Sequence, residues 1–364
     1  MNVKTPTSFK RITATEMSAR LKLTEAFERL VCKHGFNRTE IPRLYPVSES
    51  FPGGDRIKLI DFDGEVLCVV DNPIIGLLNA RQSELERLCG HADVYSFKGQ
   101  NRNKFLSSAI ITGFSGAEVE AELITVALSV LRDLGVEGNI YLGHTSVLQG
   151  IAELYLATRV DGATLRSLLR ATPHTDAELA LERMLRETAS VKGGLTELKG
   201  AAEKITNKVS VAGLKSLFDV YEILSEIGLG EKVFFDLSIV GEDFGGLAFE
   251  IRDDNGNTLI KGGRYDFGSG HGVCRCVGMT MDPDSLLELY PIIKNEDGGD
   301  VVIGVAKGIK AFQSAYKLKT SLTDKGFSVT MLYHTDKENV DAYATAFRIH
   351  SAVYVDAEGG LITE

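Results

Sequence analysis

The chain has 364 residues, of which 44% are hydrophobic and 25% are charged, as in globular proteins with a sizeable core and more than one domain. No apolar stretch is long enough to cross a membrane, and the N-terminus shows no secretory signal. Five scattered cysteines fit a reducing compartment, so we expect a cytoplasmic protein with no membrane partner. The formal net charge of −10 speaks against a nucleic-acid partner, because phosphate backbones are bound by clustered Lys and Arg.

The first third of the chain predicts helices that alternate with pairs of strands. Apolar residues at helical spacing predict helices over residues 14–34, 73–89 and 117–134. The last of these begins with acidic residues and ends at a glycine, as helix termini prefer. Short apolar runs predict two strand pairs, one at 58–62 and 65–70 around the turn Asp63-Gly64, and one at 92–97 and 105–114.

The middle of the chain predicts one strand and then a block of helices. Residues 139–144 indicate a strand, and a short helix is expected at 146–157. From about 162 to 228 the pattern is helical and strongly charged, with no strand candidate. We therefore expect a helical insertion that packs on a sheet.

Strand signals return after the helical block. A strand is expected at 232–240, followed by a hairpin with Asn255-Gly256 at its tip and a last strand at 274–282. From residue 300 onward, strand and helix patterns alternate, which is typical of a small, partly parallel α/β unit.

This order of elements predicts an α+β fold with two domains. The first covers residues 1–295 and consists of an antiparallel sheet flanked by helices, with the helical insertion at about 162–228. The second covers residues 300–364, after a linker that contains Pro291 and an acidic run. We find no internal repeat that would suggest another architecture.

The most unusual string runs from Lys261 through Gly262, Gly263, Arg264, Tyr265 and Asp266. Paired glycines allow a backbone to approach a ligand closely, and the adjacent Arg264 and Asp266 carry charges that could bind polar groups. The alternative is a glycine-bearing strand end whose arginine pairs with a nearby acid. Glu242, in a turn of similar composition, is a further candidate for a ligand pocket, although such turns are often only turns.

Other potential chemistry has weaker support. His144 follows a strand and could be catalytic or structural. Cys274 and Cys276 lack the spacing of a zinc site, so we expect buried thiols and no metal. Because no phosphate-binding loop and no nucleophile–base spacing occurs, the residues by themselves predict no catalytic group and no cofactor.

The chain nevertheless resembles histidyl-tRNA synthetase and its paralogues over nearly its whole length. Residues 27–42 are similar to the dimer-forming first motif of that family, and residues 121–135 to the helix that follows its active site. The string LIKGGRYD resembles the second histidine-specific signature, and VGMTMDPDSLLEL occupies the place of motif 3. The resemblance implies a class II synthetase-like sheet domain and, at 300–364, a shortened anticodon-binding domain.

Several residues depart from the family pattern. Ser96 stands where the motif 2 arginine is expected, and Asp282 or Pro283 where the motif 3 arginine is expected. Residues 239–250, where the arginine of the first histidine-specific signature is expected, contain no arginine. The acid and the threonine that bind the amino acid's ammonium group in the family are replaced around residues 69–75. A glutamine and a glutamate of the family's next strand are replaced by Ser107 and Ile111. Loss of one hydrogen-bond donor that faces the charge developing in the transition state raises the activation free energy by about 3 kcal/mol or more. Because several such residues are replaced, we expect no adenylate formation.

The string YLGHTSVLQGI resembles the corresponding segment of the ATP phosphoribosyltransferase regulatory subunits, which are non-catalytic paralogues of the synthetases. The resemblance implies a chain that binds and activates a short-form ATP phosphoribosyltransferase in histidine biosynthesis. It also implies a self-dimer within a hetero-oligomer, histidine as a candidate ligand, and no tRNA partner. The alternatives are a diverged synthetase-like enzyme, and a small-ligand-binding paralogue with another partner.

Overall fold

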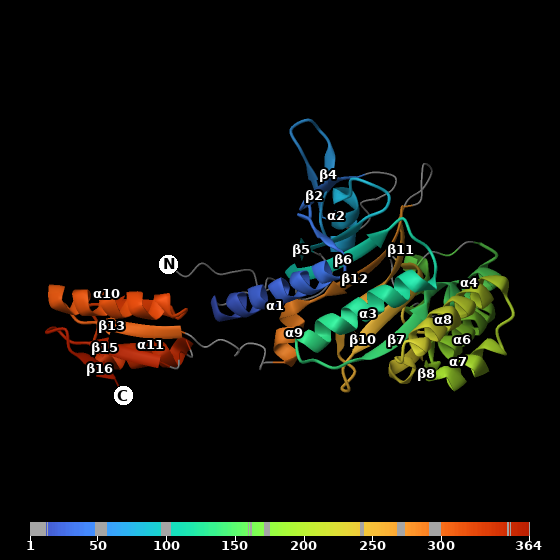
Figure 1. Cartoon of the computed structure of the whole chain (residues 1–364). Coiled ribbons are helices and arrows are strands. Elements are labelled where there is room, and N and C mark those ends of the chain that lie inside the picture. Colours follow the sequence, from blue (N-terminus) through green and yellow to red (C-terminus); the bar gives the residue numbers. More distant parts are fainter. Residues whose placement is uncertain are drawn as a thin grey trace. The chain divides into compact units, whose positions relative to one another are not determined.

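The structure, a computed structural model, describes residues 12, 14–47, 57–95, 103–158, 160, 162–170, 175–240, 244–267, 274–290, 300–347, 349 and 351–363. The chain divides into two compact units, one that contains residues 17–289 and one that contains residues 290–364 (Figure 1). The first unit is built on a large, mainly antiparallel sheet and the second on a small, mainly parallel sheet. The α+β class expected from the sequence is confirmed.

Segments from distant parts of the chain form the large sheet. Its strands are β1 (Asn37–Arg38), β5 (Arg87–Tyr95), β6 (Asn103–Thr112), β7 (Asn139–His144), β8 (Lys192–Gly193), β9 (Val233–Asp236), β10 (Phe244–Arg252), β11 (Thr258–Phe267) and β12 (Cys274–Met281). They lie in the order β1-β5-β6-β12-β11-β10-β7-β9-β8. Because β12 pairs with both β6 and β11, the two halves of the unit meet in the middle of the sheet.

The hairpin between β10 and β11 confirms the turn predicted at Asn255-Gly256. Oδ1 of Asp253 accepts hydrogen bonds from the backbone N–H groups of Asn255 and Asn257, at 3.0 and 2.8 Å. Gly256 has φ +82°, a conformation that glycine adopts without strain. The turn sets the register that places Glu250 opposite Lys261.

Four helices and a small sheet complete the frame around these strands. The helices are α1 (Ala14–Lys33), α2 (Pro73–Ala80), α3 (Ala117–Asp133) and α9 (Pro283–Leu289). Helix α3 packs over β10, β11 and β12 with a buried apolar stripe, whereas α2 packs against β5, β6 and β12. The small sheet has the order β2-β4-β3, with β2 (Leu44–Pro46), β3 (Lys58–Ile60) and β4 (Val66–Val69), and it contains the predicted hairpin around Asp63-Gly64.

The prediction of a helix over residues 73–89 is wrong in its second half. Helix α2 ends at Ala80, and strand β5 begins at Arg87. Between them the carboxylate of Glu86 accepts hydrogen bonds from the backbone N–H groups of Gln82 and Ser83, which turns the chain. Pairing of β5 with β6 then outweighs the helical pattern of the segment.

Helix α4 (Thr145–Leu156) follows β7, and after it four helices, with one short strand among them, form the helical insertion. They are α5 (Gly162–Arg170), α6 (Asp176–Ala189), α7 (Leu195–Ala202) and α8 (Lys208–Glu226), and the short helix η1 (Gly230–Lys232) follows them. Helix α4 packs against α6 and α8. The expectation that this block holds no strand is wrong, because β8 lies between α6 and α7 and pairs with β9.

The second unit confirms the alternating pattern of the tail. It contains β13 (Asp300–Val305), α10 (Ile309–Asp324), β14 (Ser328–Tyr333), α11 (Lys337–Phe347), β15 (Ser351–Val355) and β16 (Leu361–Thr363). Strand β13 pairs in parallel with β14 and β15, and β16 pairs antiparallel with β15. Among the described residues of the whole chain, no helix is both long and apolar enough to span a membrane.

Candidate functional site

A pocket of about 480 Å³ lies over the face of the sheet that β6, β12, β11 and β10 form. The start of α2 and the segment after β9 form its sides. Its polar and charged lining residues are Asp71, Asn72, Ser238, Glu250, Arg252, Lys261, Tyr265 and Thr280. Its apolar lining residues are Pro73, Leu106, Ile239, Val240, Phe244 and Phe249. Such a volume is typical of a small-molecule site.

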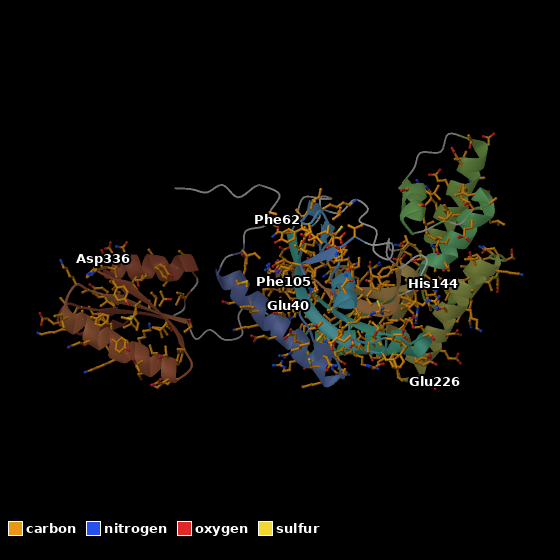
Figure 2. The ribbon with its side chains drawn as sticks, turned by 90° about the horizontal axis from the view of Figure 1, so that it is seen from above. Glu40, Phe62, Phe105, His144, Glu226 and Asp336 are labelled. Carbon is orange, nitrogen blue, oxygen red and sulfur yellow. The ribbon has the colours of Figure 1, made fainter. Side chains whose placement is uncertain are left out.

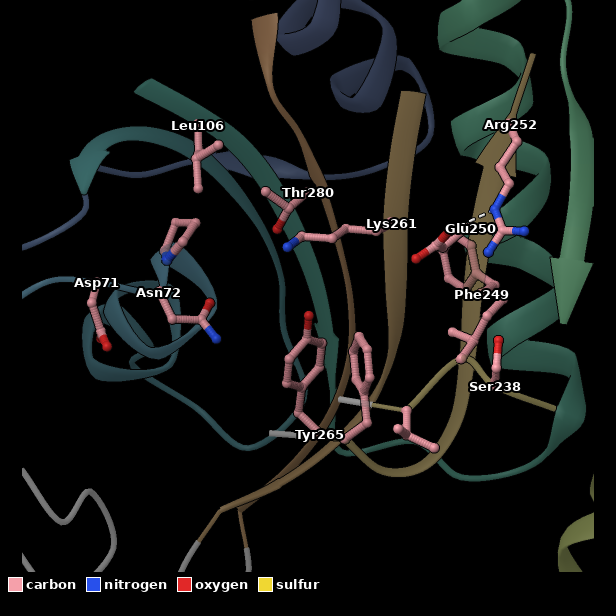
Figure 3. A pocket seen from close by; sticks show the side chains of 14 residues that line it. Asp71, Asn72, Leu106, Ser238, Phe249, Glu250, Arg252, Lys261, Tyr265 and Thr280 are labelled. Atoms are coloured by element: carbon pink, nitrogen blue, oxygen red, sulfur yellow. Dashed lines mark hydrogen bonds and ion pairs between the residues drawn. The ribbon is translucent and has the colours of Figure 1, made fainter. Parts of the chain in front are cut away.

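The charges of the pocket are balanced. Asp71 and Glu250 are acidic, and Arg252 and Lys261 are basic. Nε of Arg252 donates a hydrogen bond of 2.7 Å to Oε2 of Glu250, and Figure 3 shows the Lys261 side chain reaching into the same space from the neighbouring strand. A site with charges of both signs suits a zwitterionic ligand better than a polyanion.

Asp71 brings an acidic side chain to the pocket from the segment at 69–75. The start of α2 is fixed by Asn72, whose Oδ1 accepts a hydrogen bond of 3.0 Å from the backbone N–H of Ile74, with Pro73 at the first helical position. Asp71 directly precedes this cap and lines the pocket. The expectation that the family's ammonium-binding acid is replaced in this segment stays a prediction.

The predicted string Gly262–Asp266 is divided between the two faces of β11. Tyr265 lines the pocket, where its ring lies 4.8 Å from that of Phe244. Arg264 points to the opposite face, as alternation along a strand requires. There its Nε donates a hydrogen bond of 2.6 Å to Oε1 of Glu120 on α3, so Arg264 pairs with a buried acid.

The two glycines of the string lie against neighbouring protein atoms. A Cβ on Gly262 would meet the backbone O of Gly278 and the ring of Phe249, and a Cβ on Gly263 would meet the backbone of β10. Asp266 is exposed, with Oδ1 at 3.5 Å from Nε of Arg275. Glu242 lies outside the described residues. Ligand binding by this set of residues stays a prediction, and among its described members Tyr265 lines the pocket.

His144 occupies a structural position at the end of β7. The residue is buried where the sheet meets the helical insertion (Figure 2), and its Nδ1 accepts a hydrogen bond of 3.2 Å from the N–H of Ser146 at the start of α4. Burial, and secondly the charge of Arg264, lower the pKa of His144 to about 4. The imidazole is therefore neutral at pH 7 and caps a helix.

Four charged residues of the pocket lie outside the predicted site residues, although one of them, Lys261, is the first residue of the unusual string. Glu250 and Arg252 occupy alternate positions of β10, and Lys261 lies opposite Glu250 in the register set by the hairpin turn. The turn signal in the sequence is therefore enough to find this acid–base pair. Asp71 comes from a distant segment that only the folded sheet brings near. Within the described ranges, no three His, Cys, Asp or Glu side chains are grouped so that they could hold a metal ion.

Comparison with known proteins defines the class to which this fold and pocket belong. The family described as histidyl-tRNA synthetase matches residues 74–286, more than half of the chain, and the chain belongs to this family. A solved histidyl-tRNA synthetase from Nostoc sp. has the same fold, with a TM-score of 0.70 and 16% identity over 99% of this chain and 96% of that one.

Regulatory subunits are prominent among the similar proteins. The ATP phosphoribosyltransferase regulatory subunit of Clostridium kluyveri is 24% identical over 93% of this chain and 95% of that protein. The corresponding protein of Thermus thermophilus is 25% identical over 81% of this chain and 86% of that protein. A crystal structure described as an ATP phosphoribosyltransferase regulatory subunit/histidyl-tRNA synthetase from Bacillus halodurans shares the fold, with a TM-score of 0.72 and 18% identity over 96% and 97% of the two chains.

Proposed function

We propose that this chain is a non-catalytic regulatory subunit that binds and activates a short-form ATP phosphoribosyltransferase in histidine biosynthesis. The names of relatives that match over most of their length support this role. We further propose that the chain forms a dimer with itself inside the hetero-oligomer, and that residues 300–364 form a shortened relative of an anticodon-binding domain.

The observation that carries the proposal is the acidic start of α9, in the place where synthetases carry their motif 3 arginine. Asp282 accepts a hydrogen bond from the backbone N–H of Ser285, and its carboxylate forms an ion pair of 3.1 Å with Nζ of Lys104. Asp284, two residues further along the chain, accepts a hydrogen bond of 2.8 Å from Nε of Arg20. Asp282 and Asp284 supply no cation for a nucleotide phosphate, and each is already paired with a basic side chain of the protein.

The other departures from the synthetase pattern are consistent with a lost adenylation site. Oγ of Ser107 lies 3.0 Å from Nδ1 of His91, and Ile111 is buried in the sheet, so both side chains serve the fold. Ser96 lies outside the described residues. The balanced charges of the pocket supply no net positive charge for a triphosphate.

The same pocket supports histidine as the ligand. Asp71 can accept hydrogen bonds from an ammonium group, and Arg252 or Lys261 can bind a carboxylate. The hydroxyl of Tyr265 and the amide of Asn72 face the same space from opposite walls (Figure 3), where they can bind imidazole nitrogens. Leu106 and Phe244 supply apolar contacts to a ring.

Mixing the purified chain with a short catalytic phosphoribosyltransferase tests the proposal. We expect a complex that elutes earlier than either chain, a higher turnover of the catalytic subunit, and inhibition of this turnover by histidine. If mixing changes neither elution nor turnover, the proposed role is wrong. Histidine-dependent exchange of pyrophosphate into ATP by the chain alone would instead support a diverged synthetase-like enzyme.

A further inference from the structure

The buried carboxylate of Asp236 joins the pocket to the helical insertion. Asp236 is 1% exposed and lies at the end of β9. Its Oδ1 accepts hydrogen bonds from Oγ and N of Ser238, at 2.5 and 3.1 Å. Its Oδ2 accepts one hydrogen bond of 2.9 Å from Nη1 of Arg252 and lies 3.2 Å from Nζ of Lys192. One carboxylate therefore holds two residues of the pocket wall and one residue of the insertion.

On the pocket side, Asp236 fixes the position of Arg252. The guanidinium of Arg252 also lies 4.5 Å from the ring centre of Tyr141 and donates to Glu250. These contacts with Tyr141, Glu250 and Asp236 hold the planar group in one orientation. A ligand carboxylate that binds Arg252 would compete with Glu250 and Asp236 for the same donors.

On the insertion side, Lys192 belongs to β8, the two-residue strand that links α6 to α7. Strand β8 pairs with β9 so that Lys192 lies opposite Asp236, and the N–H of Leu237 donates to the backbone O of Val191 at 3.1 Å. These contacts attach the turn between α6 and α7 to the sheet. A shift of Asp236 therefore acts directly on the place where the insertion is attached.

We infer that Asp236 is a positioning residue that couples Arg252 and Ser238 of the pocket to Lys192 of the helical insertion. A ligand that binds in the pocket and shifts Arg252 or Ser238 then changes the contact between Asp236 and Lys192. The helices of the insertion that flank Lys192 are the elements whose stability changes. The part that concerns histidine rests on the proposed function; the coupling between the two regions does not. The carboxylate remains ionised because hydrogen bonds from Ser238, Arg252 and Lys192 outweigh its burial, so that its pKa is lowered.

Coupling of this kind is reciprocal. A substitution in the pocket must therefore change the stability of the insertion near Lys192, and a substitution at Lys192 must change the stability of the pocket wall. Lys192 is exposed on its surface side, with 57% of its side chain accessible, so Lys192→Met should fold. It removes one of the donors to a buried carboxylate and leaves Asp236 to be satisfied by Ser238 and Arg252 alone. Arg252→Met makes the corresponding change from the pocket side.

Amide hydrogen exchange on the full chain without ligand tests the coupling. We expect Lys192→Met to accelerate exchange about tenfold at residues 237–240 of the pocket wall, as well as at 190–195. Arg252→Met should accelerate exchange at 190–202 of the insertion by a similar factor. Lys192→Arg keeps a cation and should restore the wild-type pattern. The matched control Lys199→Met, at an exposed position of α7, should leave exchange at residues 237–240 unchanged.

The outcomes separate coupling from local anchoring. If Lys192→Met affects only residues near position 192, or if Lys199→Met affects residues 237–240 equally, Asp236 does not couple the two regions. Addition of histidine is a separate measurement. Histidine should slow exchange at 190–202 in the wild type about threefold or more and not in Lys192→Met. Absence of any histidine effect would count against the pocket ligand and leave the ligand-free result standing.

Discussion

The two faces of strand β11 place neighbouring residues of one sequence motif in different surroundings. Towards α3, Arg264 pairs with Glu120, a carboxylate 2% exposed, in a setting that includes the buried His144. Towards the pocket, Lys261 and Tyr265 border open space together with charges of both signs. On the α3 face the charge of Arg264 is paired with a protein carboxylate, whereas the pocket face borders a cavity with room for a ligand. The difference shows that a motif shared by a family need not act as one functional unit.

The largest expected effect is on the α3 face. Arg264→Met would leave the carboxylate of Glu120 buried without its cation, and its Oε2 already has no hydrogen-bond partner among the described residues. We expect a loss of about 3–5 kcal/mol in the free energy of unfolding, measured by denaturant titration. The double variant Arg264→Met/Glu120→Gln should recover part of this loss. A single variant as stable as the wild type would contradict the ion pair's structural role.

The second effect is a pH dependence from His144. Its folded pKa of about 4 lies below the usual value near 6.5, so the unfolded chain binds a proton at a higher pH than the folded one. The neutral His144 therefore contributes to the free energy of unfolding in full above about pH 6.5. As the pH falls towards 4, this free energy decreases by roughly 3 kcal/mol. His144→Asn keeps a capping acceptor, and its unfolding free energy should fall less over this range. If the unfolding free energies of the wild type and His144→Asn fall equally with pH, the pH dependence does not come from His144.

A smaller loss is expected at Gly262, within the strand itself. An added methyl group would meet the backbone O of Gly278 and the ring of Phe249, so Gly262→Ala should lower the unfolding free energy by about 1–3 kcal/mol. Gly246→Ala is the matched control, because its Cβ would meet only the Arg264 side chain at 3.4 Å or more. If both variants lose the same stability, close packing does not explain the paired glycines.

The smallest effect on stability is expected on the pocket face. Lys261 is exposed, so Lys261→Met should change the unfolding free energy by no more than about 0.5 kcal/mol. If the pocket binds histidine, the same variant should bind it about tenfold more weakly by calorimetry, because a charged hydrogen bond is lost. Unchanged affinity alongside unchanged stability would exclude Lys261 from the binding site.

Local signals in the sequence were enough to predict most elements, though not all of their ends. Asn255-Gly256 predicts the hairpin and its register, and the apolar stripe at 117–134 predicts α3, because turn geometry and helical spacing are short-range properties. No local signal marks the end of α2 at Ala80, because β5 is stabilised by neighbours from other parts of the chain. No local signal marks β8 either, because two residues are too few to show a period.

The sequence by itself therefore determined the family, the α+β class and the string at Gly262–Asp266. Only the tertiary structure decided which members of that string face a pocket, because the direction of Arg264 and Tyr265 depends on which side of the sheet α3 covers. It also brought Asp71, from the segment before α2, to the cavity that Glu250 and Lys261 of the hairpin line. Pairing between distant strands is a long-range interaction, and no local pattern of residues specifies it.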